Sequence, residues 1–165
     1  MRHLPVKSWP LATVLAFGLL LATAGSTSAG CYDYTRLDKA FARKTNAARV
    51  DKSVGKLKLD PHLARVARYH TKEMIRKGEL VHTPIAKLGR RVTRWVALAE
   101  NIGVGGSVKS LHRAFMKSAG HRANILNSAY EFFGIGAIKK GKKIWITAVF
   151  EAKRNPGTRL KMPSC

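Results

Sequence analysis

The sequence predicts an α+β fold: a three-layer α-β-α sandwich with a mostly antiparallel central sheet. Segments with helical periodicity come early in the chain, and strand-like segments come late. One of the late strands carries apolar residues on both of its faces. Because a strand that is apolar on both faces is typical of a sheet covered on both sides, helices are expected above and below the sheet.

Three segments have the periodicity or the capping residues of α-helices. In residues 35–50, apolar residues recur near helical spacing while Lys and Arg occupy the outer positions. Asp60 precedes a proline that opens the amphipathic segment 61–78, and that segment stops at a glycine. Ser107 is the expected cap of a third helix near 108–117.

The later part of the chain has the pattern of strands. Residues 132–138 and 143–152 flank the sequence KKGKK, which predicts a β-hairpin with Gly141 in the turn. The second of these strands alternates two apolar-rich faces, as a central strand does. Residues 95–105 mix β-forming residues with an apolar run, and residues 55–60 are expected to form a loop.

The N-terminus has the layout of a secretory signal peptide over residues 1–29. Arg2 and Lys7 precede an apolar run at 11–24, and small residues follow it. The alternative is a retained transmembrane anchor, but the run is shorter than the roughly 20 residues that a span needs. We therefore expect residues 30–165 to form a single secreted domain.

Cys31 and Cys165 are the two cysteines of the chain, and they stand near its two ends. In a secreted protein such a pair favours one disulfide, and the ends of a domain often lie close together. The alternative is a lipid anchor on Cys31. The preceding Ser-Ala-Gly lacks the aliphatic residue typical of lipidation sites, so the disulfide is the preferred interpretation.

The charge is strongly basic, with 31 Lys and Arg residues against 9 Asp and Glu and a formal net charge of +22. Such a surface attracts polyanions, which outside a cell include anionic envelope polymers, acidic lipids and free DNA. The charges are spread along the chain and are not gathered in one arm. They predict loose association with anionic polymers or lipids by a monomer, and no specific recognition of nucleic acid.

The chain lacks the common catalytic motifs: a Gly-x-Ser-x-Gly elbow, a His-Glu-x-x-His helix, a phosphate-binding glycine loop and a Cys-x-x-Cys pair. Three titratable residues remain in apolar settings: His82, Glu100 and His121. A carboxylate inside an apolar run needs donors or a cation nearby. If the three residues converge, His82 and His121 could bind a divalent metal such as zinc.

Other polar residues are expected to have structural roles. His70 lies on the apolar face of its helix, one turn from Glu73, and is interpreted as a core histidine with satisfied hydrogen bonds. Two further histidines are expected at the surface, and two asparagines are expected to brace loops: His62, His112, Asn101 and Asn124.

The order of five sequence pieces resembles the bacterial branch of the CAP superfamily, the SCP-like extracellular domains. The superfamily also contains cysteine-rich secretory proteins, insect-venom antigens and plant pathogenesis-related proteins. The resemblance covers about Leu37 to Phe150. Its pieces are Asn-x-x-Arg (46–49), Leu-x-x-Asp-x-x-Leu-x-x-x-Ala (57–67), His-Thr (82–83), Glu-Asn-Ile (100–102) and Ser-x-Gly-His-Arg-x-Asn-Ile-Leu (118–126).

The resemblance implies the CAP fold, secretion and a cleft lined by His82, Glu100 and His121. The sequence departs from the family in two places. Ala99 stands where relatives have glycine, and the stretch just before His121 lacks the second acid of eukaryotic members, which weakens the metal site. CAP proteins are associated with lipid or sterol binding, with interactions between organisms and with hydrolysis, so fold alone does not choose a reaction.

Three functions follow as hypotheses. The first is a secreted binding or interaction module with a His/Glu cleft, more consistent with a non-enzyme. The second is a metal-assisted hydrolase in which His82 and His121 bind the metal and Glu100 activates water. The third is a cationic binder of anionic envelope polymers or lipids.

Overall fold

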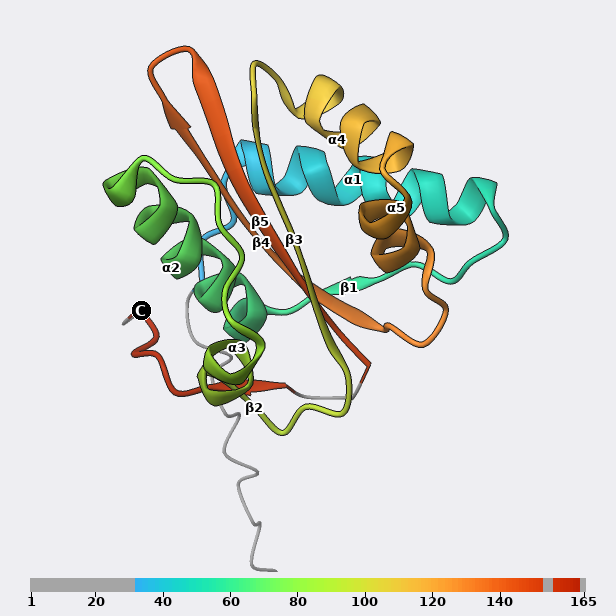
Figure 1. Ribbon diagram of the computed structural model, residues 1–165. Coiled ribbons are helices and arrows are strands. Elements are labelled where there is room, and N and C mark those ends of the chain that lie inside the picture. The colour runs from blue at the N-terminus through green and yellow to red at the C-terminus, as the bar shows by residue number, and fades with distance from the viewer. Residues whose placement is uncertain (1–31, 153–155, 164–165) are drawn as a thin grey trace, which may run out of the picture.

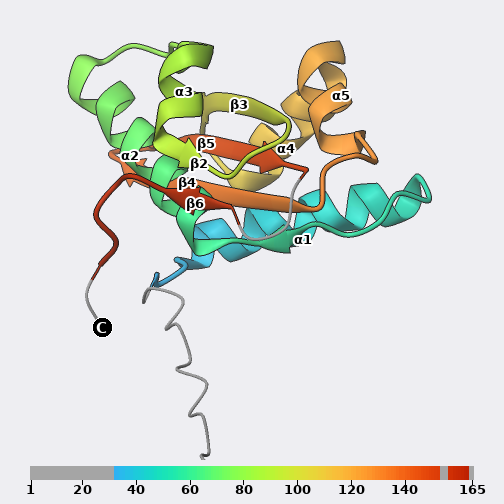
Figure 2. The same ribbon diagram turned by 90° about the horizontal axis from the view of Figure 1, so that it is seen from below.

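In the computed structural model, residues 32–152 and 156–163 form a four-stranded sheet between two layers of helices, with a small second sheet beside it (Figures 1 and 2). Helices α1 (Arg36–Asp51), α4 (Val108–Lys117) and α5 (Ala119–Leu126) cover one face. Helix α2 (Pro61–Lys77) covers the other face, with α3 (Ile85–Arg91) on the same side. The predicted three-layer sandwich is confirmed.

The large sheet is mixed, in the order β1-β4-β5-β3. Its strands are β1 (Lys58–Leu59), β3 (Leu98–Gly105), β4 (Phe132–Lys140) and β5 (Lys143–Glu151). The pairs β4–β5 and β5–β3 are antiparallel, while β1 runs parallel to β4. The expectation of a loop over residues 55–60 is therefore wrong at its end, because a two-residue strand is too short to show alternation. The small sheet pairs β2 (Val92–Thr93) with β6 (Gly157–Thr158).

The predicted caps of two helices are confirmed. Asp60 accepts a hydrogen bond from the backbone N–H of Leu63 at the start of α2, and Gly78 ends that helix with φ +74°. Ser107 caps α4 by accepting from the N–H of Ser110. Helices α3 and α5 have no side-chain cap, which is one reason why the sequence indicates them less clearly.

The two faces of β5 contact different layers. Ile146, Ala148 and Phe150 belong to the large core that α1, α4 and α5 complete. On the opposite face the backbone of β4 lies directly against α2. A Cβ atom added at Gly134 would stand 2.0 Å from the backbone nitrogen of Ala64, so only glycine permits this approach.

A buried arginine joins α1 to the segment that follows α5. The guanidinium of Arg49 donates hydrogen bonds to four backbone carbonyls, those of Gly55, Ile125, Asn127 and Tyr130. Burial lowers the pKa of Arg49. Asn46, one turn earlier, exchanges two hydrogen bonds with the backbone of Leu57. The Asn-x-x-Arg piece of the sequence is thus a structural device that fixes loops to α1.

Two predictions concern residues outside the described part of the chain. The signal peptide over residues 1–29 and the disulfide between Cys31 and Cys165 both fall there. Within the described residues, no helix combines the length and the apolar composition that crossing a bilayer requires.

Candidate functional site

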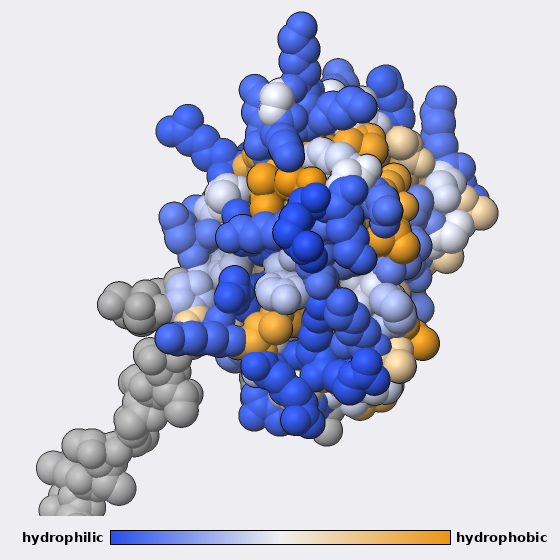
Figure 3. Space-filling model, turned by 60° about the vertical axis from the view of Figure 1, so that its left-hand side comes forward, coloured by the Kyte–Doolittle hydropathy of each residue, from blue (hydrophilic) through white to orange (hydrophobic). Residues whose placement is uncertain are grey.

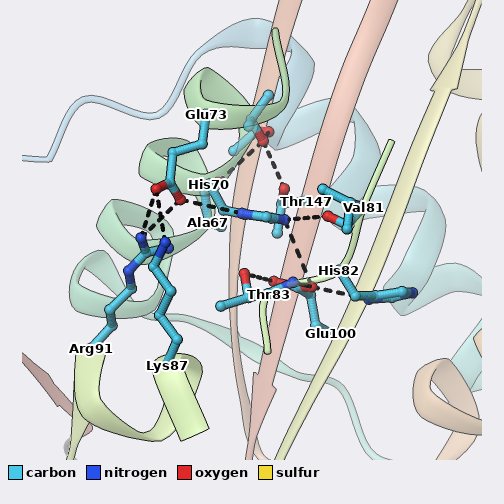
Figure 4. A network of polar contacts seen from close by, with 12 residues as sticks. Ala67, His70, Glu73, Val81, His82, Thr83, Lys87, Arg91, Glu100 and Thr147 are labelled. Carbon is cyan, nitrogen blue, oxygen red and sulfur yellow. Dashed lines mark hydrogen bonds and ion pairs between the residues drawn. The ribbon is translucent and has the colours of Figure 1, made fainter. Parts of the chain in front are cut away.

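Glu100, on β3, is surrounded by hydrogen-bond donors although only 4 % of its side-chain surface is exposed. Its Oε1 accepts from the backbone N–H of Thr83 at 2.8 Å, and its Oε2 accepts from the Thr83 hydroxyl at 2.7 Å. The Nδ1 of His82 lies 3.0 Å from Oε1 (Figure 4). The buried carboxylate therefore organises the loop between α2 and α3.

The contact with Glu100 fixes the orientation and the tautomer of His82. A carboxylate only accepts hydrogen bonds, so Nδ1 of His82 carries the proton. The other ring nitrogen, Nε2, is directed away from Glu100 (Figure 4), and 56 % of the His82 side chain is exposed. A neutral His82 thus presents a lone pair at its exposed end, which is the form that binds a metal or accepts a proton.

His70 lies behind this pair and is almost completely buried. Its Nε2 stands 2.8 Å from the carbonyl oxygen of Val81, and its Nδ1 stands 3.4 Å from Oε2 of Glu73. Its Nε2 is also 3.9 Å from Oε1 of Glu100. His70 is thus the core histidine that the sequence analysis expected, and its bond to Val81 holds the residue before His82.

Glu73 ties α2 to α3 through two basic side chains. Lys87 Nζ lies 3.1 Å from its Oε1, and Arg91 Nη2 lies 2.8 Å from its Oε2. Burial raises the pKa of Glu73, but the hydrogen bonds from Arg91 and Lys87 outweigh burial and lower that pKa below its usual value. The loop that carries His82 is therefore anchored at both ends. A cavity of about 190 Å³ lies under this loop and is bordered by His82 and His70.

His121 belongs to the opposite layer, in the first turn of α5. Its ring packs against that of Phe115, with 4.6 Å between the ring centroids. Asn101 donates a hydrogen bond to the backbone carbonyl of His121 at 2.9 Å, and Asn124 in turn donates to Asn101 at 2.8 Å. These two asparagines brace α5 against β3, whereas the sequence predicted that they brace loops.

Burial lowers the pKa of His121, and a positive charge on His82 would lower it further. Glu100 and Asn101 are consecutive residues of β3, so their side chains point to opposite faces of the sheet. β3 is an edge strand of the sheet. Glu100 bonds His82 from the α2 side, and Asn101 bonds the carbonyl of His121 from the α5 side.

The donor set at this edge is small for a metal centre. Over residues 32–152 and 156–163, no three His, Cys, Asp or Glu side chains lie together in a way that could hold a metal ion. Catalytic zinc sites use three protein ligands and structural sites use four. A divalent cation held by His82 and His121 would need water or a bound ligand to complete its coordination.

Two features of this region were not predicted from the sequence. Thr83 supplies two of the donors to Glu100, and its only signal was its position directly after His82. His112 was expected at the surface but is half-buried, with its ring edge-on to Phe41 at 5.5 Å between centroids. Its place on α4 between the apolar positions 111 and 115 could have indicated this packing.

A larger groove lies elsewhere on the described surface. It has a volume of about 860 Å³ and runs between α1 and the segment around β1, where Ala42, Val50 and Leu57 contribute to its lining. None of the three candidate residues borders it. The candidate site is therefore defined by the chemistry of its side chains and by the contact of His82 with Glu100, and not by the volume of a cavity.

Known proteins resemble this chain both in sequence and in fold. The family model described as "CAP: Cysteine-rich secretory protein family" matches residues 42–150. The uncharacterized protein YkwD of Bacillus subtilis (strain 168) is 28% identical over 130 residues, which are 74% of this chain and 48% of YkwD. The matched chain thus spans about half the length of this relative.

Two solved structures share the fold. An outer surface protein from Borrelia burgdorferi superposes with a TM-score of 0.67 at 17% identity, covering 76% of this chain and 99% of that protein. An extracellular protein containing an SCP domain from Bacillus anthracis str. Ames superposes with a TM-score of 0.63 at 23% identity, covering 71% of this chain and 40% of that protein. At these identities the likeness is one of fold.

Proposed function

Because the chain belongs to the CAP family of cysteine-rich secretory proteins, we propose that it is an extracellular binding module whose ligand is held between His82 and His121. The names of two structural neighbours, an outer surface protein and an extracellular protein, support the location. The basic charge and the leader-like residues 1–29 support it as well.

The burial and the hydrogen bonds of Glu100 are the main support for this proposal. A general base must reach the proton that it removes. Glu100 is buried, and both of its oxygens already accept hydrogen bonds from Thr83, with His82 as a further partner. Its chemistry is that of a carboxylate that orients an imidazole, which suits a preformed binding site better than activation of water.

The ligand chemistry follows from the two imidazoles. Neutral imidazoles offer lone pairs, so the site would accept a divalent cation such as zinc or a group that donates hydrogen bonds. When bound, a cation would supply Lewis acidity to an oxygen of a second ligand. The protein's own part is to fix His82 through Glu100 and Thr83, and to fix the backbone at His121 through Asn101.

Isothermal calorimetry with Zn²⁺ on protein purified without chelator tests the proposal. His82→Ala and His121→Ala should each weaken zinc binding by about 10-fold or more. His62→Ala is the matched control, since His62 lies at the start of α2 and contacts Asp60 rather than Glu100. Zinc binding that is unchanged in both cleft variants, or equally weakened in the control, would refute the site.

Turnover assays on the same wild-type and variant proteins distinguish the hydrolase from the binding module. Zinc-dependent turnover of peptide or cell-wall substrates that disappears in His121→Ala would replace the binding proposal with the metal-assisted hydrolase. Zinc binding without turnover supports the binding module. A third function, capture of anionic envelope polymers by charge alone, predicts binding that is lost at high salt and unchanged in both histidine variants.

A further inference from the structure

Exposed large hydrophobic side chains gather on one segment of the chain. Seven such residues are exposed among the described residues, and five of them lie within residues 80–96. These five are Leu80, Val81, Ile85, Trp95 and Val96, which we call the apolar rim. Single exposed hydrophobic residues are normal on a protein surface, but a concentration of this kind marks an interaction site.

The loop after α2 and helix α3 lie along one side of the molecule (Figures 1 and 2). In Figure 1 the loop after α2 runs down the front of the molecule to α3, and Figure 2 places that loop and α3 along the same edge. The indole of Trp95 lies over Gly89 of α3 and donates a hydrogen bond to the Gly89 carbonyl at 3.0 Å. Ile85 is one helical turn before Gly89, so Ile85 and Trp95 share a face of α3.

Exposed basic residues are interspersed in sequence with the apolar rim. Lys77, Arg90 and Arg94 are exposed next to it in sequence, and Glu79 is the sole acidic residue in the sequence from 77 to 96. Figure 3, which turns the side with α2 toward the viewer, shows separate hydrophobic areas within a mostly hydrophilic surface. The rim therefore combines aliphatic and indole groups with positive charge.

We propose that the apolar rim docks the protein onto lipid bilayers that contain anionic lipids. Aliphatic and Trp side chains enter the boundary between headgroups and acyl chains, while Lys and Arg attract anionic headgroups. A soluble anionic polymer would neutralise the charge but would leave Leu80, Ile85 and Val96 in water. A second copy of the chain would bring two sets of these basic residues together, which like-charge repulsion opposes.

The rim is held in a defined shape before any lipid is present. His70 fixes Val81 through its carbonyl, Glu73 holds α3 through Lys87 and Arg91, and Trp95 is bonded to α3. A preformed surface loses little conformational entropy on binding. This proposal does not rest on the function proposed for His82 and His121, although docking would bring His82, the neighbour of Val81, close to the lipid surface.

Vesicle co-sedimentation tests the proposal, with vesicles of phosphatidylcholine alone or mixed with phosphatidylglycerol. The protein is used in the form that its host produces, and mass spectrometry establishes its N-terminus, because the apolar run 11–24 would bind lipid if it were retained. The triple variant Leu80→Ser, Ile85→Ser, Val96→Ser should partition into mixed vesicles about 10-fold less than the wild type. Circular dichroism verifies that each variant is folded.

One further variant tests the basic residues, and two control variants, one apolar and one basic, show whether the loss of vesicle binding is specific to the rim. Val50→Ser removes an equally exposed apolar side chain from α1 and should leave partition unchanged. The variant Lys77→Gln, Arg90→Gln, Arg94→Gln should weaken binding by about 10-fold or more. The variant Lys140→Gln, Lys142→Gln, Lys143→Gln removes the same charge from the exposed hairpin turn and should have a smaller effect.

Fluorescence supplies a readout at the rim itself. Mixed vesicles should shift the emission of Trp95 to shorter wavelength, and lipids brominated on the acyl chains should quench it; Trp95→Phe should abolish both changes. The proposal is overturned if the triple serine variant binds vesicles like the wild type, or if Val50→Ser weakens binding equally. It is also overturned if neither the wild type nor the triple serine variant binds vesicles, while the serine substitutions dissociate a dimer or abolish binding to an anionic polymer.

Discussion

Oε1 of Glu100 lies 3.0 Å from Nδ1 of His82, and this contact joins a buried strand residue to a mostly exposed imidazole. Thr83 supplies two further hydrogen bonds to the same carboxylate. The orientation of His82 is therefore set by the core of the protein, and not by the loop alone. Carboxylate–histidine pairs of this kind fix the direction of the imidazole.

The Thr83 hydroxyl is the first test of this arrangement. Thr83→Val keeps the shape of the side chain but leaves Oε2 of Glu100 without its donor, so we expect a loss of about 1–3 kcal/mol in the free energy of unfolding. Urea denaturation measures this loss. Ser128→Ala, which removes an exposed hydroxyl, should change the same quantity by less than about 0.5 kcal/mol. Equal effects of the two variants would contradict the prediction.

Arg49 is expected to be essential for stability. Arg49→Met leaves four buried or partly buried carbonyls without their donor, so we expect a loss of at least about 3 kcal/mol of unfolding free energy. Arg43→Met, on the exposed face of the same helix, should cost less than about 0.5 kcal/mol. Thermal unfolding of both variants decides the matter, and similar melting temperatures would disprove the role of Arg49.

The close approach of β4 to α2 predicts strong intolerance of a methyl group. Gly134→Ala places Cβ against the backbone of Ala64, which cannot move without displacing α2, so we expect a loss of about 3 kcal/mol or failure to fold. Gly106→Ala, where nothing lies within 4 Å of the added atom, is the control. The difference is measured by comparing the yields of soluble protein and the midpoints of urea denaturation of the two variants.

His112 should titrate below the ordinary histidine range. Burial lowers its pKa, and the charge of Lys44 adds to this effect. Lys44→Gln should therefore raise the pKa of His112 without restoring it fully, as the NMR chemical shift of the imidazole Cε1–H against pH would show. A titration unmoved by this substitution would be inconsistent with the second cause.

The same shift has a consequence for stability. Because the folded protein resists protonation of His112, the unfolded chain binds more protons below about pH 6.5. Folding stability should therefore fall as the pH drops from about 6.5 toward the folded pKa, and should be insensitive to His112 above that range. His121, whose pKa is also lowered, contributes with the same sign. Urea midpoints across this pH range measure the slope.

The sequence predicts those elements that carry both a cap and a sustained period. Helix α2 has Asp60 at its start and Gly78 at its end, and the β4–β5 hairpin turns at Gly141 with φ +58°. Strands β1, β2 and β6 have two residues each, so neither alternation nor length could indicate them. Their pairing is decided by tertiary contacts and not by local preference.

The sequence predicts the residues of the candidate site but not the hydrogen bonds that hold them. His82, Glu100 and His121 attract attention as titratable residues in apolar stretches. That Glu100 bonds Thr83, or that the carbonyl of His121 is held by Asn101, depends on which face of β3 each residue occupies. A shift of one residue in the strand register would move each side chain of β3 to the opposite face of the sheet. The sequence of a single strand does not determine its register.

The acceptors of Arg49 also constrain how the chain acquires its structure during synthesis. One of them follows at residue 55, but the other three lie between residues 125 and 130. Asp38, also on α1, receives one of its hydrogen bonds from the backbone N–H of Ala137. The first helix therefore keeps two charged groups incompletely paired until most of the chain has been made. Contacts of such long sequence separation slow folding, and a chain truncated before residue 125 would retain an unstable first helix.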